Sequence, residues 1–191
     1  MAEVKNILFV GVGGQGIILA SKILSRGLID AGYDVKMSEV HGMAQRGGSV
    51  TTQIRYGQKV YSPIIGVGQA DVIVSFEKME ALRWLEYLKP NGKVVVNNFE
   101  ISPMPVLSGK MPYAKDILET IQSKTDTTVI NAAEEAEKLG NPKVMNIILL
   151  GTIVKAMGLE DINWNELIAK NVKPAFIDLN QKALSVGMNL I

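Results

Sequence analysis

A strand, a glycine-rich loop and a helix follow one another at the start of the chain, and this order constrains the fold more than any other feature. Residues 5–10 form a short apolar run typical of a buried strand, and residues 17–31 carry apolar side chains at helical spacing. Gly11, Gly13 and Gly16 between them have the spacing of a dinucleotide-binding loop. The opening therefore predicts a nucleotide-type α/β fold.

Strand and helix patterns continue to alternate along the rest of the chain. This alternation predicts a three-layer, Rossmann-like α/β fold, in which a largely parallel sheet has helices on both faces. Three prolines place residues 101–112 in an extended loop or at a sheet edge. The further predicted strands are 34–38, 49–56, 59–62 after a turn at Gly57-Gln58, 71–76, 93–96 and 128–130; the further helices are 78–88, 114–123, 132–139, 144–157, 164–171 and 174–186.

Composition limits the classes of protein to which the chain can belong. A length of 191 residues suits one domain spanning residues 1–191. The net charge of +1 gives no attraction for nucleic acid or anionic lipid. The longest apolar run, residues 147–154, is far below the ~20 residues that span a bilayer. With no export signal at the N-terminus, we expect a cytoplasmic protein that contacts neither membrane nor nucleic acid.

The sequence contains no cysteine. It therefore cannot supply thiolates to an iron–sulfur cluster or to a cysteine-type zinc site. Acidic residues show no metal-ligand spacing either. We expect no metal site and no catalytic residue in this chain.

The first glycine loop is a candidate anion site, because the exposed amides at the start of the following helix carry partial positive charge. Its candidate binding residues are Gly11, Gly13, Gly14, Gln15 and Gly16. The structural alternative is that these glycines only allow close chain packing. Glu39 could serve as the ribose-binding acid of an NAD site, which makes an NAD-dependent dehydrogenase one alternative and a stand-alone CoA or nucleotide-binding module another. One argument speaks against a dehydrogenase. The rest of the chain completes one sheet and its helices, so no residues are left for a substrate domain.

A second glycine-rich loop spans residues 41–49, where a nucleotide fold normally starts its next helix. It carries the single histidine of the chain and an arginine, whose planar guanidinium holds several hydrogen-bond donors in a fixed arrangement. Its glycines permit close approach of another backbone. Its candidate residues are His41, Arg46, Gly47, Gly48 and Ser49. For His41 the passive role of a packed surface side chain is favoured; for Arg46 contact with a partner or an anionic ligand is favoured.

Three segments carry a family resemblance: Gly-Val-Gly-Gly-Gln-Gly at 11–16, Ser-Glu-Val-His-Gly-Met-Ala-Gln-Arg-Gly-Gly-Ser-Val at 38–50, and Ala-Asp-Val-Ile-Val-Ser-Phe-Glu at 70–77. With them the chain resembles, over essentially its whole length, the gamma-type subunits of 2-oxoacid:ferredoxin oxidoreductases, and among these the indolepyruvate branch.

The resemblance implies a subunit and not a complete enzyme. Complexes of this family decarboxylate a 2-oxoacid on thiamine diphosphate, pass electrons through [4Fe-4S] clusters to ferredoxin and release an acyl-CoA. This chain lacks the Gly-Asp-Gly segment that holds the Mg2+-bound diphosphate, so Asn97-Asn98 is not part of such a site. We therefore expect thiamine diphosphate, Mg2+ and the clusters in a larger alpha subunit, and an isolated chain without activity. Both loops would then contact CoA or face the alpha subunit.

Overall fold

The computed structural model describes residues 4–41 and 47–191. The strands are β1 (Lys5–Val12), β2 (Asp34–His41), β3 (Ser49–Gly57), β4 (Ala70–Ser75), β5 (Leu88–Asn97) and β6 (Asp126–Ile130). The helices are α1 (Ile17–Asp30), α2 (Lys78–Arg83), α3 (Met104–Leu107), α4 (Ile117–Gln122), α5 (Ala132–Lys138), α6 (Met145–Ala156), α7 (Trp164–Asn171) and α8 (Ile177–Met188). Single 3-10 turns cover Leu85–Tyr87, Pro142–Val144 and Pro174–Phe176.

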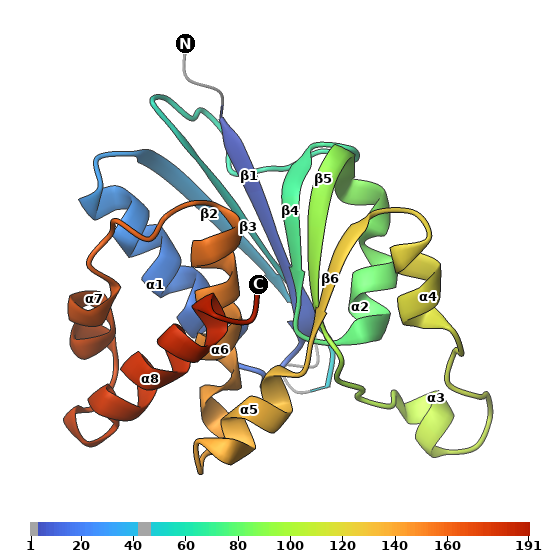
Figure 1. The fold of residues 1–191 in the computed structure, drawn as a ribbon. Helices are drawn as coiled ribbons and strands as arrows, with labels where there is room; N and C mark the ends of the chain where they lie inside the picture. Colours follow the sequence, from blue (N-terminus) through green and yellow to red (C-terminus); the bar gives the residue numbers. More distant parts are fainter. Residues whose placement is uncertain (1–3, 42–46) are drawn as a thin grey trace.

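The six strands form one mixed sheet in the order β2-β3-β1-β4-β5-β6 (Figure 1). β1, β4, β5 and β6 are parallel neighbours, as the alternating pattern predicts. β3 is antiparallel to both β1 and β2, so the prediction of a largely parallel sheet is wrong for this half. The reason is the length of the 42–48 connection, which is too short for the crossover that parallel strands require. β2 and β3 therefore pair as a hairpin, and β3 lies between β2 and β1.

Helices lie against both faces of this sheet. Successive side chains of a strand point to opposite faces, so Ile7 and Phe9 of β1 belong to one buried cluster and Leu8 and Val10 to the other. The first cluster also contains residues of α1, α5, α6, α7 and α8, and the second contains residues of α2 and α4. The α/β class is thus as predicted, with a mixed sheet in place of a parallel one.

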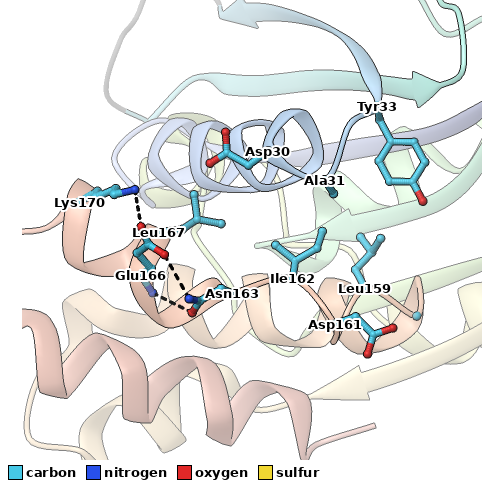
Figure 2. A pocket seen from close by; sticks show the side chains of 11 residues that line it. Asp30, Ala31, Tyr33, Leu159, Asp161, Ile162, Asn163, Glu166, Leu167 and Lys170 are labelled. Carbon is cyan, nitrogen blue, oxygen red and sulfur yellow. Dashed lines mark hydrogen bonds and ion pairs between the residues drawn. The ribbon is translucent and has the colours of Figure 1, made fainter.

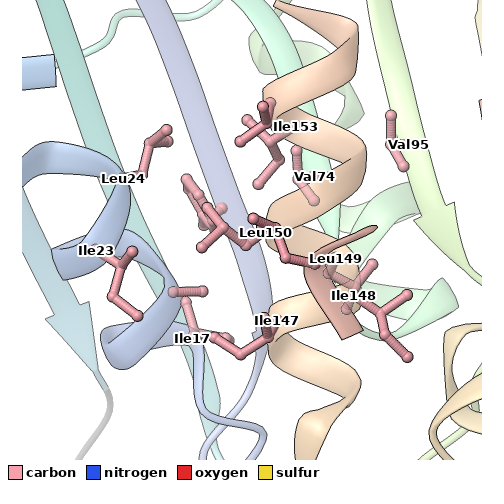
Figure 3. Packing of buried hydrophobic residues seen from close by; sticks show 14 of the residues in the cluster. Ile17, Ile23, Leu24, Val74, Val95, Ile147, Ile148, Leu149, Leu150 and Ile153 are labelled. Atoms are coloured by element: carbon pink, nitrogen blue, oxygen red, sulfur yellow. The ribbon is translucent and has the colours of Figure 1, made fainter. Parts of the chain in front are cut away.

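Helix α6 lies at the centre of the first face. Residues 145–154 are all buried, and α6 lies beside α1 over the same face of the sheet (Figure 3). Two glycines let α8 cross α6 closely: a Cβ on Gly151 would lie 2.3 Å from the carbonyl oxygen of Leu184, and one on Gly187 only 1.9 Å from that of Ile148. The longest apolar run of the sequence is therefore a core helix, as predicted.

Some segments differ locally from the predicted secondary structure, because tertiary contacts determine their conformation. The predicted strand 59–62 is not a strand; its connection is held by Arg55, whose guanidinium donates to the carbonyl oxygens of Ser62 and Ile64. The predicted helix 78–88 ends at Arg83 and continues as a 3-10 turn, because β5 begins at Leu88. Residues 101–112 contain the short helix α3.

Candidate functional site

The two glycine loops meet beside the carboxyl end of β1. The amide of Gly13 donates to the carbonyl oxygen of Gly48 (2.8 Å), and the amide of Gly47 donates to that of Gly13 (3.3 Å). These bonds continue the antiparallel pairing of β1 with β3 beyond the ends of both strands. The loops therefore form one surface.

Glycine is required in the first loop for two different reasons, close packing at some positions and a positive φ at another. A Cβ on Gly11 would lie 2.7 to 2.8 Å from Gln15, Ile17 and Phe76, and one on Gly16 would lie 2.6 Å from Asn146. Gly14, by contrast, has a φ of 104°, and a Cβ placed on it would have no atom of residues 4–41 or 47–191 within 4 Å. Gly11 and Gly16 thus serve packing, whereas Gly14 leaves open space.

Gln15 fastens the loop from inside. Its Oε1 accepts from the amide of Val12 (2.7 Å), and its Nε2 donates to the carbonyl oxygen of Phe76 (2.9 Å). Both ends of the side-chain amide are therefore engaged with the backbones of β1 and of the residue that follows β4. This side chain holds the shape of the loop.

A pocket of about 470 Å³ opens at this surface. Its walls are apolar, with Ile17 and Ile18 from α1 and Val50 from β3. Among the described residues that line it, His41 at the end of β2 is the one with an ionisable side chain. The remaining lining residues are Val12, Gly13, Gly14, Gln15 and Gly16. Helix α1 begins here at Gly16 without a side-chain cap and without an acidic residue in its first turn. The start of a helix in this state favours a negatively charged group.

The described residues of the second loop, His41 and 47–49, have different positions relative to this pocket. His41 lines it, and Gly47 and Gly48 are tied to the first loop, but Ser49 points to the other face of the sheet and donates to Glu80 Oε2 (2.5 Å). The inclusion of Ser49 in the predicted loop surface is therefore not matched by its side chain, because alternate residues of β3 face opposite sides. Arg46 lies outside the described residues.

The NAD interpretation meets a geometric obstacle. In a dinucleotide fold the ribose-binding acid follows the strand next to the glycine-loop strand. Here β3 separates β2 from β1, so Glu39 on β2 is about 10 Å from β1, two strand spacings instead of one. Glu39 instead faces Thr52 across the β2–β3 pair. The mixed sheet thus disfavours the ribose contact on which the dehydrogenase alternative depends.

A second polar centre, which the sequence did not reveal, surrounds Glu77 after β4. Its side chain is 1% exposed and accepts from the amide of Glu80 (3.0 Å), from the amide of Ile101 (3.3 Å) and from the hydroxyl of Tyr113 (2.5 Å). Burial, followed by the hydrogen bond to Glu77, raises the pKa of Tyr113, so its hydroxyl stays protonated and donates. A signal was present, since Glu77 ends the third family segment.

Another pocket, of about 410 Å³, lies at the far end of α1, between that helix and α7 (Figure 2). Three of its polar side chains contact one another: Glu166 pairs with Lys170 (2.5 Å) and accepts from Asn163 (3.1 Å). These contacts hold the first turns of α7 together. None of the predicted site residues that the structure describes lines this pocket, so the glycine-loop pocket remains the candidate site.

Two absences among the described residues bear on other functions. Within residues 4–41 and 47–191 no group of three or more histidine, cysteine, aspartate or glutamate side chains is placed to hold a metal ion. In the same part of the chain, no helix has the length and apolar character needed to cross a membrane. Asn97 also has a structural role: its side chain donates to the carbonyl oxygen of Phe76 and accepts from the amide of Ala132.

The chain is similar in sequence and in fold to known oxidoreductase subunits. The indolepyruvate oxidoreductase subunit IorB of Pyrococcus horikoshii is 39% identical over 191 residues, with 96% of this chain and 94% of that protein covered. The crystal structure of the keto/oxoacid ferredoxin oxidoreductase gamma subunit of Geobacter sulfurreducens matches with a TM-score of 0.72 and 25% identity, covering 97% of each chain.

The same fold also forms part of a longer polypeptide. The 2-oxoglutarate:ferredoxin oxidoreductase of Magnetococcus marinus matches with a TM-score of 0.78 at 17% identity, covering 98% of this chain but 31% of that one. The family model of pyruvate ferredoxin/flavodoxin oxidoreductases matches residues 6–190. The chain therefore belongs to the pyruvate ferredoxin/flavodoxin oxidoreductase family.

Proposed function

We propose that this chain is the gamma-type subunit of a cytoplasmic 2-oxoacid:ferredoxin oxidoreductase that acts on an arylpyruvate of the indolepyruvate class. The complex would decarboxylate the 2-oxoacid oxidatively, transfer the acyl group to CoA and reduce ferredoxin. The 39% identity to an indolepyruvate oxidoreductase subunit, spread over nearly the whole of both chains, supports the assignment to this branch. Residues 1–191 would act as one Rossmann-like domain.

The division of labour follows from what this chain lacks. With no cysteine it cannot ligate an iron–sulfur cluster, and with no Gly-Asp-Gly segment it has no clamp for a Mg2+-bound diphosphate. We assign thiamine diphosphate, Mg2+ and the [4Fe-4S] clusters to a larger alpha subunit, which also passes electrons to ferredoxin. The present chain would complete the site without performing chemistry of its own.

The open, apolar pocket at the uncapped start of α1 is the observation that supports a CoA site at the glycine loops. Coenzyme A combines a diphosphate with long stretches of apolar and amide character. The uncapped start of α1 favours the diphosphate, and the open space at Gly14 lets it approach the backbone. Ile17, Ile18 and Val50 offer apolar contact to the rest of the ligand. Bound there, CoA would supply the thiol that accepts the acyl group.

His41 stands at the rim of the pocket and Arg46 belongs to the same loop in sequence. We assign Arg46 to a phosphate of CoA or to the alpha subunit; its place in the proposal rests on the sequence. The architectural alternative remains, in which both loops face the alpha subunit and shape the route to thiamine diphosphate.

Reconstitution tests the proposal. The isolated chain should show no turnover of indolepyruvate with thiamine diphosphate, CoA and a viologen acceptor, whereas adding the purified alpha subunit should restore acyl-CoA formation. Turnover by the chain alone, or micromolar binding of NAD in a calorimeter, would contradict it.

Two variants separate the ligand from the partner. Gly14→Ala and Arg46→Ala should raise the KM for CoA while the complex still assembles. If Arg46→Ala instead weakens assembly and leaves the KM for CoA unchanged, the loop contacts the alpha subunit. Unchanged assembly and unchanged KM in both variants would remove the glycine loops from the site.

A further inference from the structure

The segment that carries α3 is an apolar projection at the same edge of the sheet as the glycine loops. Met104 is 73% exposed, Leu107 68% and Met111 54%. Lys110 is the only charged residue between positions 101 and 112. Figure 1 shows α3 standing apart from the sheet and from α2 and α4. Several exposed large apolar side chains within one short segment are typical of an interaction surface.

The projection is ordered by its own backbone. The amides of Leu107, Ser108 and Lys110 donate to the carbonyl oxygens of Pro103, Met104 and Pro105, at 2.9 to 3.0 Å. Prolines at 103, 105 and 112 restrict the backbone further. A surface held in one conformation before binding loses little entropy when a partner covers it.

Both ends of the projection are fastened to the buried carboxylate of Glu77. The amide of Ile101 donates to it at the start of the segment, and the hydroxyl of Tyr113 donates to the same oxygen at the end. An ion pair between Lys78 and Glu100 (2.9 Å) adds a third attachment next to the first. The apolar tip is therefore held in a fixed direction relative to β4 and α2.

This attachment is continuous with the glycine-loop pocket. The carbonyl oxygen of Phe76 accepts from Gln15, which fastens the first glycine loop, and the next residue, Glu77, fastens the projection. The backbone at 76–77 thus sets the position of both features. Both features therefore lie at the same end of the parallel strands, which is the end that a partner of the pocket would approach.

We propose that residues 101–112 are the docking arm through which this chain binds the alpha subunit, with Met104, Leu107 and Met111 inserted into an apolar groove of that subunit. The inference rests on the proposed function, because it is the alpha subunit that must approach the glycine-loop pocket to use a ligand held there. A second copy of this chain has no such reason to cover this edge.

The affinity of the purified alpha subunit for the full-length chain tests the arm. Met104→Ser combined with Leu107→Ser should raise the Kd at least about tenfold, because a few buried apolar anchors carry most of the binding energy of an interface. The matched control is Tyr61→Ser combined with Val67→Ser; these side chains are 90% and 62% exposed on the β3–β4 connection, at the opposite edge of the sheet, and their loss should leave the Kd unchanged.

A second measurement does not depend on weakened binding. A photoreactive phenylalanine in place of Leu107 should crosslink to the alpha subunit, and the same residue in place of Val67 should not. Tyr113→Phe, which frees one end of the arm but keeps its apolar surface, should raise the Kd by a few-fold. Crosslinking of the arm to a second copy of this chain, or to no protein, would overturn the proposal.

The outcomes also separate this inference from the proposed function. If the unaltered chain does not bind the alpha subunit or restore turnover, the proposed function fails. If it does both, and the arm variant binds as tightly as the control variant, the arm alone is refuted. With a functional arm, saturating alpha subunit should return the arm variant to full turnover.

Discussion

The glycine-loop pocket and the cluster around Glu77 are neighbours at one edge of the sheet, yet they are built in opposite ways. At the pocket, Gly14 leaves space and α1 begins without a side-chain cap. Around Glu77, a carboxylate that is 1% exposed accepts three hydrogen bonds from three different segments. The pocket therefore leaves space and hydrogen-bond donors for a ligand. The carboxylate of Glu77 instead forms its hydrogen bonds with other residues of the same chain.

This difference separates function from stability. Changes at the Glu77 cluster should act on the free energy of unfolding, because they leave buried donors without an acceptor. Changes at the open side of the pocket should act on ligand binding and leave the fold nearly as stable. Substitutions in the two regions test the separation.

The largest effect is expected for Glu77→Ala. The amides of Glu80 and Ile101 and the hydroxyl of Tyr113 would lose their acceptor, which should cost about 3 kcal/mol of unfolding free energy. Urea denaturation of the isolated chain measures it. Glu100→Gln is the control, since the carboxylate of Glu100 is 42% exposed and its ion pair with Lys78 should be worth less than about 1 kcal/mol. Equal losses for the two variants would show that Glu77 is not a structural centre.

Gly11→Ala and Gly14→Ala test the packing role and the binding role of the glycine loop separately. A methyl at Gly11 would collide with Gln15, Ile17 and Phe76, so we expect a loss of about 2–3 kcal/mol. A methyl at Gly14 meets no atom of the part of the chain that the structure describes, but it requires a strained positive φ, which should cost about 1 kcal/mol.

For CoA binding we expect the opposite order, with the larger effect in Gly14→Ala. In the reconstituted complex, calorimetric titration with CoA should show a weaker Kd for Gly14→Ala and a nearly unchanged Kd for whatever fraction of Gly11→Ala is folded. A Gly14→Ala variant that binds CoA as the unaltered complex does would contradict the open-pocket interpretation.

Gln15→Ala should have an intermediate effect on stability. Its side chain joins Val12 to Phe76 through two hydrogen bonds, and their loss should cost about 1–2 kcal/mol. Thermal unfolding compared with Gln58→Ala, an exposed glutamine on the β3–β4 connection, provides the measurement. If Gln15→Ala leaves the melting temperature unchanged, its assignment as a structural residue of the loop is wrong.

The smallest effect concerns Asp34, which lies at the other end of β2 from His41. A hydrogen bond from Lys36, followed by one from the amide of Val60, lowers the pKa of Asp34 from 3.8 to about 2. Because the folded pKa lies below the unfolded one, the stabilisation is complete above pH 3.8 and is lost as the pH falls toward 2.

Asp34→Asn should therefore narrow the difference between the melting temperatures at about pH 5 and about pH 2. A steeper pH dependence in Asp34→Asn than in the unaltered chain would have the wrong sign.

Much of the fold could be predicted because local patterns carry it. The strand, glycine loop and helix at the N-terminus, the buried helix α6 and the strands β4 and β6 lie close to their predicted places. The position of β3 was missed, although the short 42–48 connection after β2 indicates a hairpin. Local pattern does not state which strand pairs with which, and the insertion of β3 beside β1 is a choice among tertiary arrangements.

The sequence marked both glycine loops as candidate binding surfaces, and their role in binding stays a prediction. Spacing located the glycine loops, but it could not tell that Gly11 serves packing and Gly14 leaves space, since both are simply glycine in the sequence. It likewise could not show that Ser49 turns to Glu80, because that depends on which side of the sheet each residue of β3 faces. Glu77 escaped notice because its donors come from positions 80, 101 and 113.

The sequence by itself determined the alternation of strands and helices, the place of both glycine loops and the absence of cysteine ligands, since each is a property of neighbouring residues or of composition. Only the tertiary structure decided that β3 separates β1 from β2, that the two loops form one surface with a pocket and that Glu77 holds the arm beside it. These depend on contacts between residues far apart in the chain, and such contacts are selected by the packing of the whole sheet.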